Sequence, residues 1–180
     1  MEDRIDTKTK EAAEQLRALG NRLEAGDDAT LHVWVLDQQL ACAHRPLRHH
    51  PRFGGSARNL SPAATDQVIQ WAQTMLASGF VSIICLMHKT ELAYYDELAL
   101  GSDNLLEFYR ASGFSVSHIE WEDPAHSKTQ PALIARKRNE VRARALDVYD
   151  VLPKPTLIHC SAGIQRSAPV AAYIWYKRGL

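Results

Sequence analysis

A short stretch near the end of the chain constrains the fold more than any other. The apolar, β-branched run over residues 155–158 predicts a short buried strand, and residues 168–175 predict a helix. Between them stand nine residues, His159-Cys160-Ser161-Ala162-Gly163-Ile164-Gln165-Arg166-Ser167. A strand, a tight loop and a helix N-terminus bring backbone N–H groups and the helix dipole together, and this arrangement binds anions. We call residues 160–166 the thiol loop.

Strands and helices alternate along most of the chain. Apolar periodicity and turn residues predict helices over residues 8–25, 62–78, 103–113 and 131–152, and strands over 31–36, 40–43, 81–86, 115–121 and 155–158. Asp103 is expected to cap the third helix. The long connections over 44–59 and 87–102 are expected to be loops. This order predicts an α/β fold with a central, mostly parallel sheet of four to five strands and helices on both faces.

Composition argues against several classes of protein. The 180 residues suit one domain, and Lys plus Arg balance Asp plus Glu at 21 each, which favours neither a nucleic-acid nor a membrane partner. The three cysteines have no metal-like or paired spacing, which is typical of free thiols in a reducing compartment. No signal peptide or membrane-spanning apolar run is visible, so we expect a cytoplasmic protein. We also expect no metal or other cofactor.

The residues of the thiol loop suit attack on a phosphate ester. Backbone N–H groups of Ser161, Ala162, Gly163, Ile164, Gln165 and Arg166 can converge on phosphate oxygens, and Gly163 permits the backbone angles required. Arg166 can bind two oxygens at once. The same positive potential favours the thiolate of Cys160, which is the nucleophile, and Ser167 can donate a hydrogen bond to the departing sulfur.

The leaving oxygen needs a proton from a separate loop. Asp123 directly follows the strand predicted over 115–121, so it should lie at the same sheet edge as Cys160. We expect Asp123 to be the general acid, with Glu122 as the fallback.

Spacing alone is weak evidence, because a second cysteine also has an arginine six positions later. Cys42 and Arg48 repeat the spacing, but no glycine lies between them, and Pro46 removes an N–H donor. The residues after Arg48 do not begin a helix. We therefore predict that Cys160 is functional and that Cys42 is structural.

The pattern His-Cys-x-x-Gly-x-x-Arg-Ser resembles the signature of cysteine-dependent protein tyrosine and dual-specificity phosphatases, over about residues 81–178. Residues 91–95 and 104–109 more loosely resemble the dual-specificity phosphatases associated with cyclin-dependent kinases and their microbial relatives. The resemblance implies a dual-specificity-phosphatase-like fold and hydrolysis of phosphotyrosine, with phosphoserine and phosphothreonine as further substrates on phosphoproteins. It also implies a phosphocysteine intermediate, no metal, and a His159 that tunes the thiol and belongs to the substrate-binding residues.

The resemblance also suggests a domain organisation. Residues 1–180 would form a single phosphatase domain, with residues 1–30 as an N-terminal helical extension and 81–180 as the catalytic half. Two further helices usually follow the loop helix in this family. Either the chain is a minimal or truncated version, or the helix over 8–25 substitutes for their packing.

Several residues keep two interpretations. Cys85 is either a buried apolar side chain or a redox partner that forms a reversible disulfide with Cys160, as in some relatives. Glu91 either pairs with Arg166 or is a surface charge. The basic cluster of residues 44–52 is a solvated loop, a substrate-steering rim or, least favoured, a metal site; it comprises His44, Arg45, Arg48, His49, His50 and Arg52.

Two alternative functions also remain. The substrate could be a phosphoinositide or an RNA 5′ phosphate, although the variable loop positions Ser161, Ala162, Ile164 and Gln165 are uncharged. The chain could instead be a pseudophosphatase that only binds phosphate. The physiological substrate and the oligomeric state stay open at this point.

Overall fold

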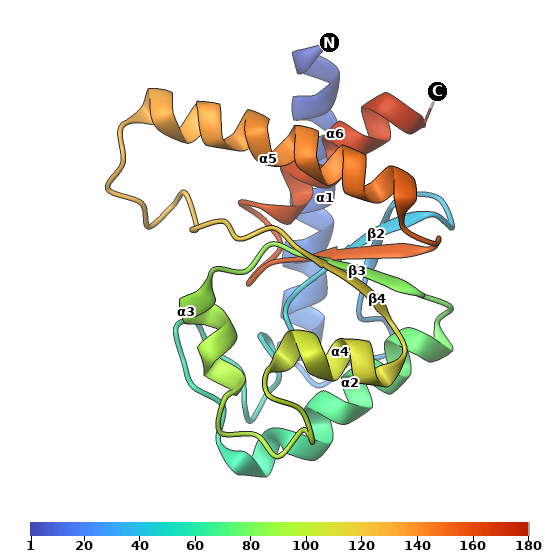
Figure 1. Ribbon diagram of the computed structural model, residues 1–180, viewed down its shortest axis with the longest axis vertical. Coiled ribbons are helices and arrows are strands. Elements are labelled where there is room, and N and C mark those ends of the chain that lie inside the picture. Colours follow the sequence, from blue (N-terminus) through green and yellow to red (C-terminus); the bar gives the residue numbers. More distant parts are fainter. Residues whose placement is uncertain (180) are drawn as a thin grey trace.

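The structure, a computed structural model, describes residues 1–179 (Figure 1). Its elements, in chain order, are α1 (Glu2–Glu24), β1 (Val33–Leu36), β2 (Leu40–Ala43), α2 (Thr65–Ala77), β3 (Ser82–Cys85), α3 (Lys89–Leu92), α4 (Leu105–Ser112), β4 (Ser115–His118), α5 (Pro131–Val151), β5 (Thr156–His159) and α6 (Ser167–Arg178). Short 3₁₀ turns occupy Pro62–Ala64 and Ala93–Tyr95.

The five strands form one mixed sheet in the order β1-β2-β5-β3-β4. β1 and β2 form an antiparallel pair, whereas β2, β5, β3 and β4 run parallel. The three inner strands are buried throughout, which explains why their sequences are mostly apolar. The α/β fold with a five-stranded, mostly parallel sheet is thus confirmed.

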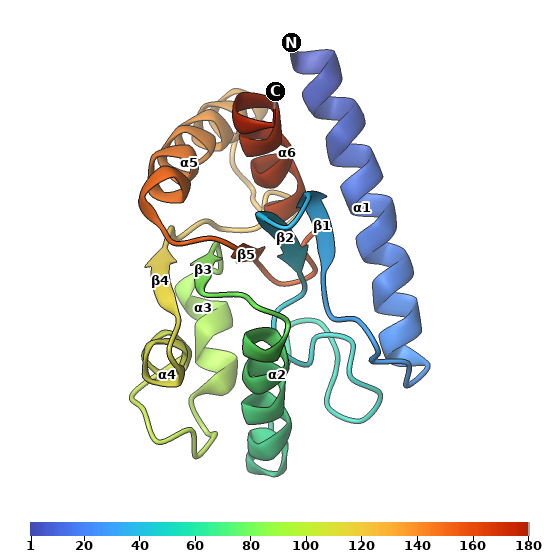
Figure 2. The same cartoon turned by 90° about the vertical axis from the view of Figure 1, so that its right-hand side faces the viewer.

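Helices cover both faces of this sheet (Figure 2). On one face α6 packs against β1, β2 and β5, with α1 and α5 beside it, and this core includes Leu16, Ile84, Ile158 and Val170. On the other face α2 and α4 cover a second core that includes Met75, Ile83 and Leu157. Consecutive apolar residues of the three inner strands β2, β3 and β5 alternate between the two cores, as the pleat requires.

Strand register aligns the ends from which the functional loops depart. Ala43 of β2 lies beside His159 of β5, His159 lies beside Cys85 of β3, and Cys85 lies beside His118 of β4. The four chain segments that follow these residues therefore leave one edge of the sheet together. Open α/β sheets bind ligands at this carboxyl edge.

Several predicted boundaries were wrong. α1 begins at Glu2 rather than at residue 8, because Ile5 is also buried. Asn104, rather than Asp103, caps α4: its Oδ1 accepts a hydrogen bond from Glu107 N at 3.0 Å. β4 ends at His118, three residues early. The supposed loop over 87–102 contains α3 and a 3₁₀ turn.

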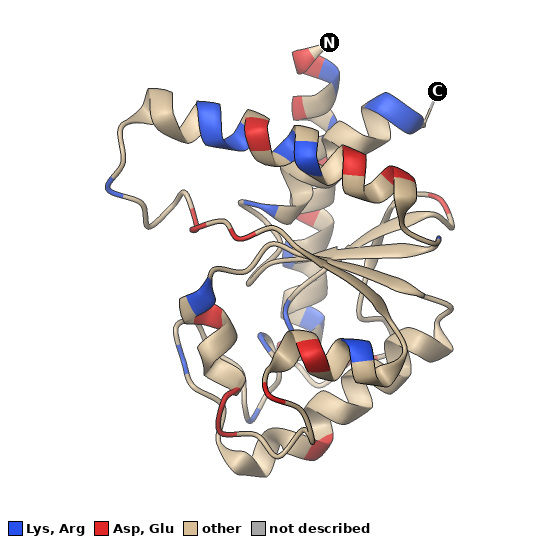
Figure 3. Ribbon diagram, in the orientation of Figure 1, with Lys and Arg blue, Asp and Glu red and all other residues tan. Residues whose placement is uncertain are grey.

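Charges of both signs alternate along α5 and are scattered over the remaining elements (Figure 3). This distribution agrees with the even balance of charged residues in the sequence. Among residues 1–179, no helix is both long enough and apolar enough to cross a membrane.

Candidate active site

The thiol loop joins β5 to the amino end of α6, as the sequence predicted. Gly163 has φ +80°, a conformation that favours glycine. A Cβ atom there would lie 3.0 Å from Ala43 O and 3.1 Å from Leu16 Cδ1. Both the backbone angle and the close packing therefore require glycine at this position.

Cys160 lies at the start of the loop with only 1% of its surface exposed. Its Sγ accepts a hydrogen bond from Gly163 N at 3.2 Å. Further along, Ala168 N donates to Gly163 O at 2.8 Å, which joins the loop to the first turn of α6. The sulfur thus already receives one of the N–H groups that the anion cradle was expected to supply.

Arg166 is completely buried and is fixed by Glu91. Its Nη1 and Nη2 donate to the two carboxylate oxygens of Glu91, each at 2.6 Å, and Nη1 also donates to Trp121 O at 2.9 Å. Glu91 is itself held in α3, where its Oε2 accepts from His88 N at 2.8 Å. The interpretation of Glu91 as the partner of Arg166 is confirmed.

This pairing sets the charge of both groups. Burial alone would raise the pKa of Glu91, but the hydrogen bonds and charge of Arg166 hold that pKa below its usual range. Burial opposes the charged form of Arg166 as well, yet Glu91, Cys160 and Asp123 together keep the guanidinium pKa above its usual range. Both groups remain ionised at neutral pH.

The guanidinium is not fully used by these contacts. Within residues 1–179, Arg166 Nε is buried and has no hydrogen-bond partner, and neither has Ser167 Oγ. A buried donor without a partner costs about 1–3 kcal/mol of stability. Two such unpartnered groups next to each other, at the end of the loop and the N-terminus of α6, therefore indicate the position of a ligand. The expected contact of Ser167 with the sulfur is not formed here.

Asp123 reaches the site from the segment between β4 and α5. Its Oδ2 lies 3.6 Å from Arg166 Nη2, and its side chain is 22% exposed. Its Oδ1 accepts from Ala125 N at 2.9 Å, which fixes the carboxyl in a tight turn. Glu122 instead lines a separate hollow beside Ser127 and Leu133. Of the two acid candidates, Asp123 is the one that lies beside Arg166.

The remaining loop residues have distinct environments. Ser161 O accepts from Arg45 N at 2.8 Å, and Ala162 O lies 2.7 Å from His44 Nδ1. Ile164 is partly buried against the core of α1 and α6, whereas Gln165 is exposed. Two residues that follow β2 therefore support the backbone of the thiol loop.

His159 directly precedes the thiol loop and is completely buried. Its Nε2 is 3.0 Å from Tyr109 Oη and its Nδ1 is 3.1 Å from Cys160 O. Burial lowers the imidazole pKa to about 4, so the ring is neutral at pH 7. We expected His159 among the substrate-binding residues; the structure gives it a supporting position, since both ring nitrogens have partners.

Cys42 and Cys85 are buried on opposite faces of the sheet. Cys42 shares the core of α1 and α6 with Cys160, whereas Cys85 belongs to the core under α2 and α4. Burial raises the pKa of Cys85 to about 12, and all three thiols are free. A Cys85–Cys160 disulfide stays a prediction, and recovery of the linked peptides after peroxide treatment is the measurement that decides it.

The basic cluster is solvated only in part: Arg52 is exposed, Arg48, His49 and His50 are half-buried, and His44 and Arg45 are buried. Arg45 is 1% exposed: its Nε donates to Ser161 Oγ at 3.3 Å, Nη1 to Tyr95 Oη at 3.2 Å and Nη2 to Gly55 O at 2.8 Å. Burial lowers the pKa of His44 to about 4. Sequence analysis missed this support, and the only available signal was the position of these residues directly after a strand.

Within residues 1–179, no three His, Cys, Asp or Glu side chains are grouped as metal ligands. Comparison of the chain with protein-family models, curated proteins and solved structures finds no match at a significant level. The geometry of this site is therefore the basis for any functional conclusion.

Proposed function

We propose that this chain is a cysteine-dependent protein phosphatase with a dual-specificity-phosphatase-like fold. It would hydrolyse phosphotyrosine on proteins, with phosphoserine and phosphothreonine as further substrates, through a phosphocysteine intermediate. The observation that carries the proposal is Arg166, which Glu91 fixes while its buried Nε keeps a free N–H. That donor lies in the same loop as the Cys160 thiol.

In the proposed reaction, the Cys160 thiolate attacks phosphorus and forms an S–P bond while the ester P–O bond breaks. Asp123 gives its proton to the leaving oxygen. Water then attacks the phosphocysteine, the S–P bond breaks and inorganic phosphate leaves. Arg166 neutralises the phosphoryl oxygens throughout, and Ser167 donates to the sulfur as it departs.

The decisive experiment compares two cysteines with the same arginine spacing. Cys160→Ser should abolish turnover of p-nitrophenyl phosphate, because serine is a far weaker nucleophile at neutral pH. Cys42→Ala removes a thiol of equal burial and should retain most of the activity. Acid quenching of the wild-type reaction should trap phosphate on the peptide that contains Cys160. Full activity in Cys160→Ser would refute the proposal.

One observation favours a second candidate, a phosphatase of a non-protein substrate such as a phosphoinositide or an RNA 5′ phosphate. Although the variable loop positions are uncharged, Arg45 brings a buried cation into contact with Ser161. A panel of phosphopeptides, phosphoinositides and 5′-phosphorylated RNA would separate the candidates by kcat/KM. A protein that binds phosphopeptide but turns over none of these compounds would instead be a pseudophosphatase.

A further inference from the structure

A cavity of about 300 Å³ opens beside the basic cluster, away from the residues assigned to catalysis. Its walls come from three parts of the chain: the carboxyl end of α1, the segment after β2, and one side of α2. Cys160, Arg166 and Asp123 are not among the residues that line it. Its size suits a small molecule rather than a protein segment.

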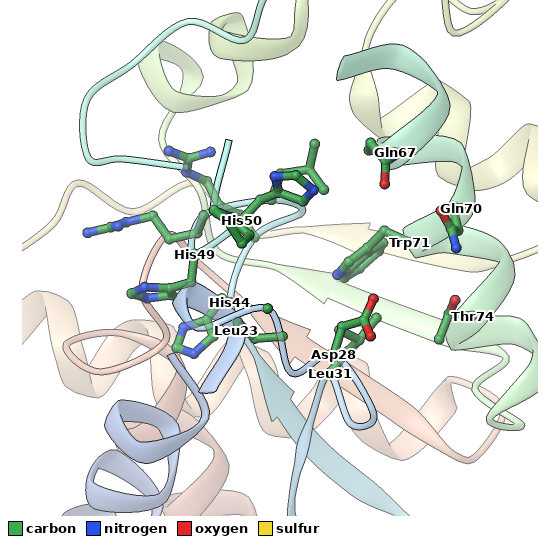
Figure 4. Close-up of a pocket in the computed structure, with 15 residues that line it drawn as sticks. Leu23, Asp28, Leu31, His44, His49, His50, Gln67, Gln70, Trp71 and Thr74 are labelled. Atoms are coloured by element: carbon green, nitrogen blue, oxygen red, sulfur yellow. The ribbon is translucent and has the colours of Figure 1, made fainter. Parts of the chain in front are cut away.

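One wall of this cavity is basic. Arg45, Arg48, His44, His49 and His50 line it, and Figure 4 shows the three histidines together on one side. Neither arginine forms an ion pair with a carboxylate among residues 1–179. Arg48 Nε is buried and, within those residues, has no hydrogen-bond partner.

The positive charges on this wall repel one another. Burial and the nearby Arg45 guanidinium hold the pKa of Arg48 below its usual range. Burial also lowers the pKa of His49, and Arg48 and Arg45 lower it further. Two acidic groups lie near this wall: Glu24 lies 2.6 Å from His49 Nδ1 and offsets part of the Arg48 charge, and Asp28 lies across the cavity beside Leu31 (Figure 4). An anion would pair with the Arg48 guanidinium, whose buried Nε has no hydrogen-bond partner among residues 1–179.

The facing wall is neutral and polar. Gln67, Gln70 and Thr74 project from α2, and the indole of Trp71 extends between them and the histidines (Figure 4). Two amide groups and an indole provide hydrogen bonds and a flat apolar surface for an uncharged ring. An inorganic ion would leave this wall without a role.

We propose that this cavity binds a small organic phosphate, with the phosphate group against Arg48 and a planar polar body against Trp71 and the α2 glutamines. The site is distinct from the thiol loop, and the inference does not depend on phosphatase activity. Residues that line the cavity nevertheless contact the thiol loop: Arg45 N donates to Ser161 O at 2.8 Å, Arg45 Nε donates to Ser161 Oγ at 3.3 Å, and His44 Nδ1 lies 2.7 Å from Ala162 O.

Adenosine 5′-monophosphate is a suitable probe, because it combines a phosphate with a planar, hydrogen-bonding base. Calorimetric titration of the Cys160→Ser protein, which cannot consume the probe by the proposed chemistry, should show a site whose affinity depends on the residues that line the cavity. Arg48→Gln should weaken binding at least tenfold, since a desolvated phosphate–guanidinium contact is lost. Arg52→Gln is the matched control: Arg52 belongs to the same segment but does not line the cavity, so affinity should change less than twofold.

A second pair of variants tests the location without changing charge. Thr74→Trp should fill the cavity and abolish binding, whereas Gln73→Trp, on an exposed position of the same helix, should not. Adenosine should bind at least tenfold more weakly than the nucleotide, and inorganic phosphate should compete with it. Equal affinity for adenosine, no binding at millimolar nucleotide, or binding that survives both Arg48→Gln and Thr74→Trp would overturn the proposal.

Discussion

The ion pair between Arg166 and Glu91 makes the sharpest prediction about this structure. Arg166 is fully buried and the Glu91 side chain is 13% exposed, so water cannot replace either partner. Glu91→Gln keeps the shape of the side chain but removes its charge and turns one oxygen into an NH₂ group. That NH₂ would face a guanidinium N–H that now has no acceptor. Loss of one partner of a buried pair costs about 3–5 kcal/mol.

Urea unfolding and thermal melting measure this loss directly. For a domain of this size each kcal/mol lowers Tm by about 2–4 °C, so the variant should melt roughly 6–20 °C lower. Glu107→Gln is the matched control, because Glu107 pairs with Arg110 on the surface of α4 and both side chains are more than 40% exposed. An exposed pair contributes about 0–1 kcal/mol, so this control should change little.

A double-mutant cycle separates the pair from other effects of the substitution. In an Arg166→Met background Glu91 is a buried carboxylate without its cation, so adding Glu91→Gln should restore stability rather than reduce it. The coupling energy between the two positions should therefore exceed about 2 kcal/mol. If Glu91→Gln is no worse than Glu107→Gln, or if its cost is the same with and without Arg166, the ion pair is not what fixes Arg166.

Three further predictions follow from individual contacts. Asp123→Ala should slow the hydrolysis of aryl phosphates with poor leaving groups far more than that of aryl phosphates with good ones, whereas Glu122→Ala should change neither rate. An equal loss of rate on both substrates in Asp123→Ala would indicate another acid. Gly163→Ala should lower the free energy of unfolding by about 1–3 kcal/mol and weaken phosphate binding. Gly101→Ala is the control and should cost less, because Gly101 has φ +72° but open space around it. Equal losses of stability in the two variants, measured by calorimetry, would exclude a packing role for Gly163. Burial lowers the pKa of His44 to about 4 from 6.5, so the unfolded chain gains a proton that the folded chain excludes. The neutral His44 therefore contributes fully to the free energy of unfolding above about pH 7, and this contribution decreases by about 2 kcal/mol when the pH is lowered to 5. Urea unfolding of His44→Gln should lack this part of the acid-induced loss of stability.

The parts of the fold that could be predicted are those set by local sequence. Buried parallel strands require continuous apolar runs, so residues 81–86 and 155–158 were identified with boundaries correct to one or two residues. Gly163 was expected from backbone geometry alone, and its φ of +80° agrees. The position of Asp123 followed from one rule, because residues after parallel strands meet at one edge of the sheet.

What could not be predicted depends on contacts between distant segments. Tyr95 and Arg45 are 50 residues apart, yet the tyrosine hydroxyl, which also donates to Pro46 O at 2.7 Å, accepts from the arginine at 3.2 Å. In the sequence both residues belong to polar stretches that are typical of surface loops. Burial of Arg45 results from the packing of those two stretches against each other, and no periodicity in either one indicates it.

The supporting contacts behind the thiol loop bear on how the proposed site would work. A phosphate bound in the thiol loop would need positive potential nearby, and Arg166 alone would not supply all of it, because Glu91 offsets its charge. Arg45 is buried against Ser161 and, within residues 1–179, has no carboxylate partner, so its charge acts on the loop with little screening. If the chain is a phosphatase, Arg45→Gln should therefore raise the KM for p-nitrophenyl phosphate, because the bound phosphate loses a nearby cation. The exposed Arg52→Gln should leave this KM unchanged. Equal KM values in both variants would mean that the backbone amides and Arg166 suffice.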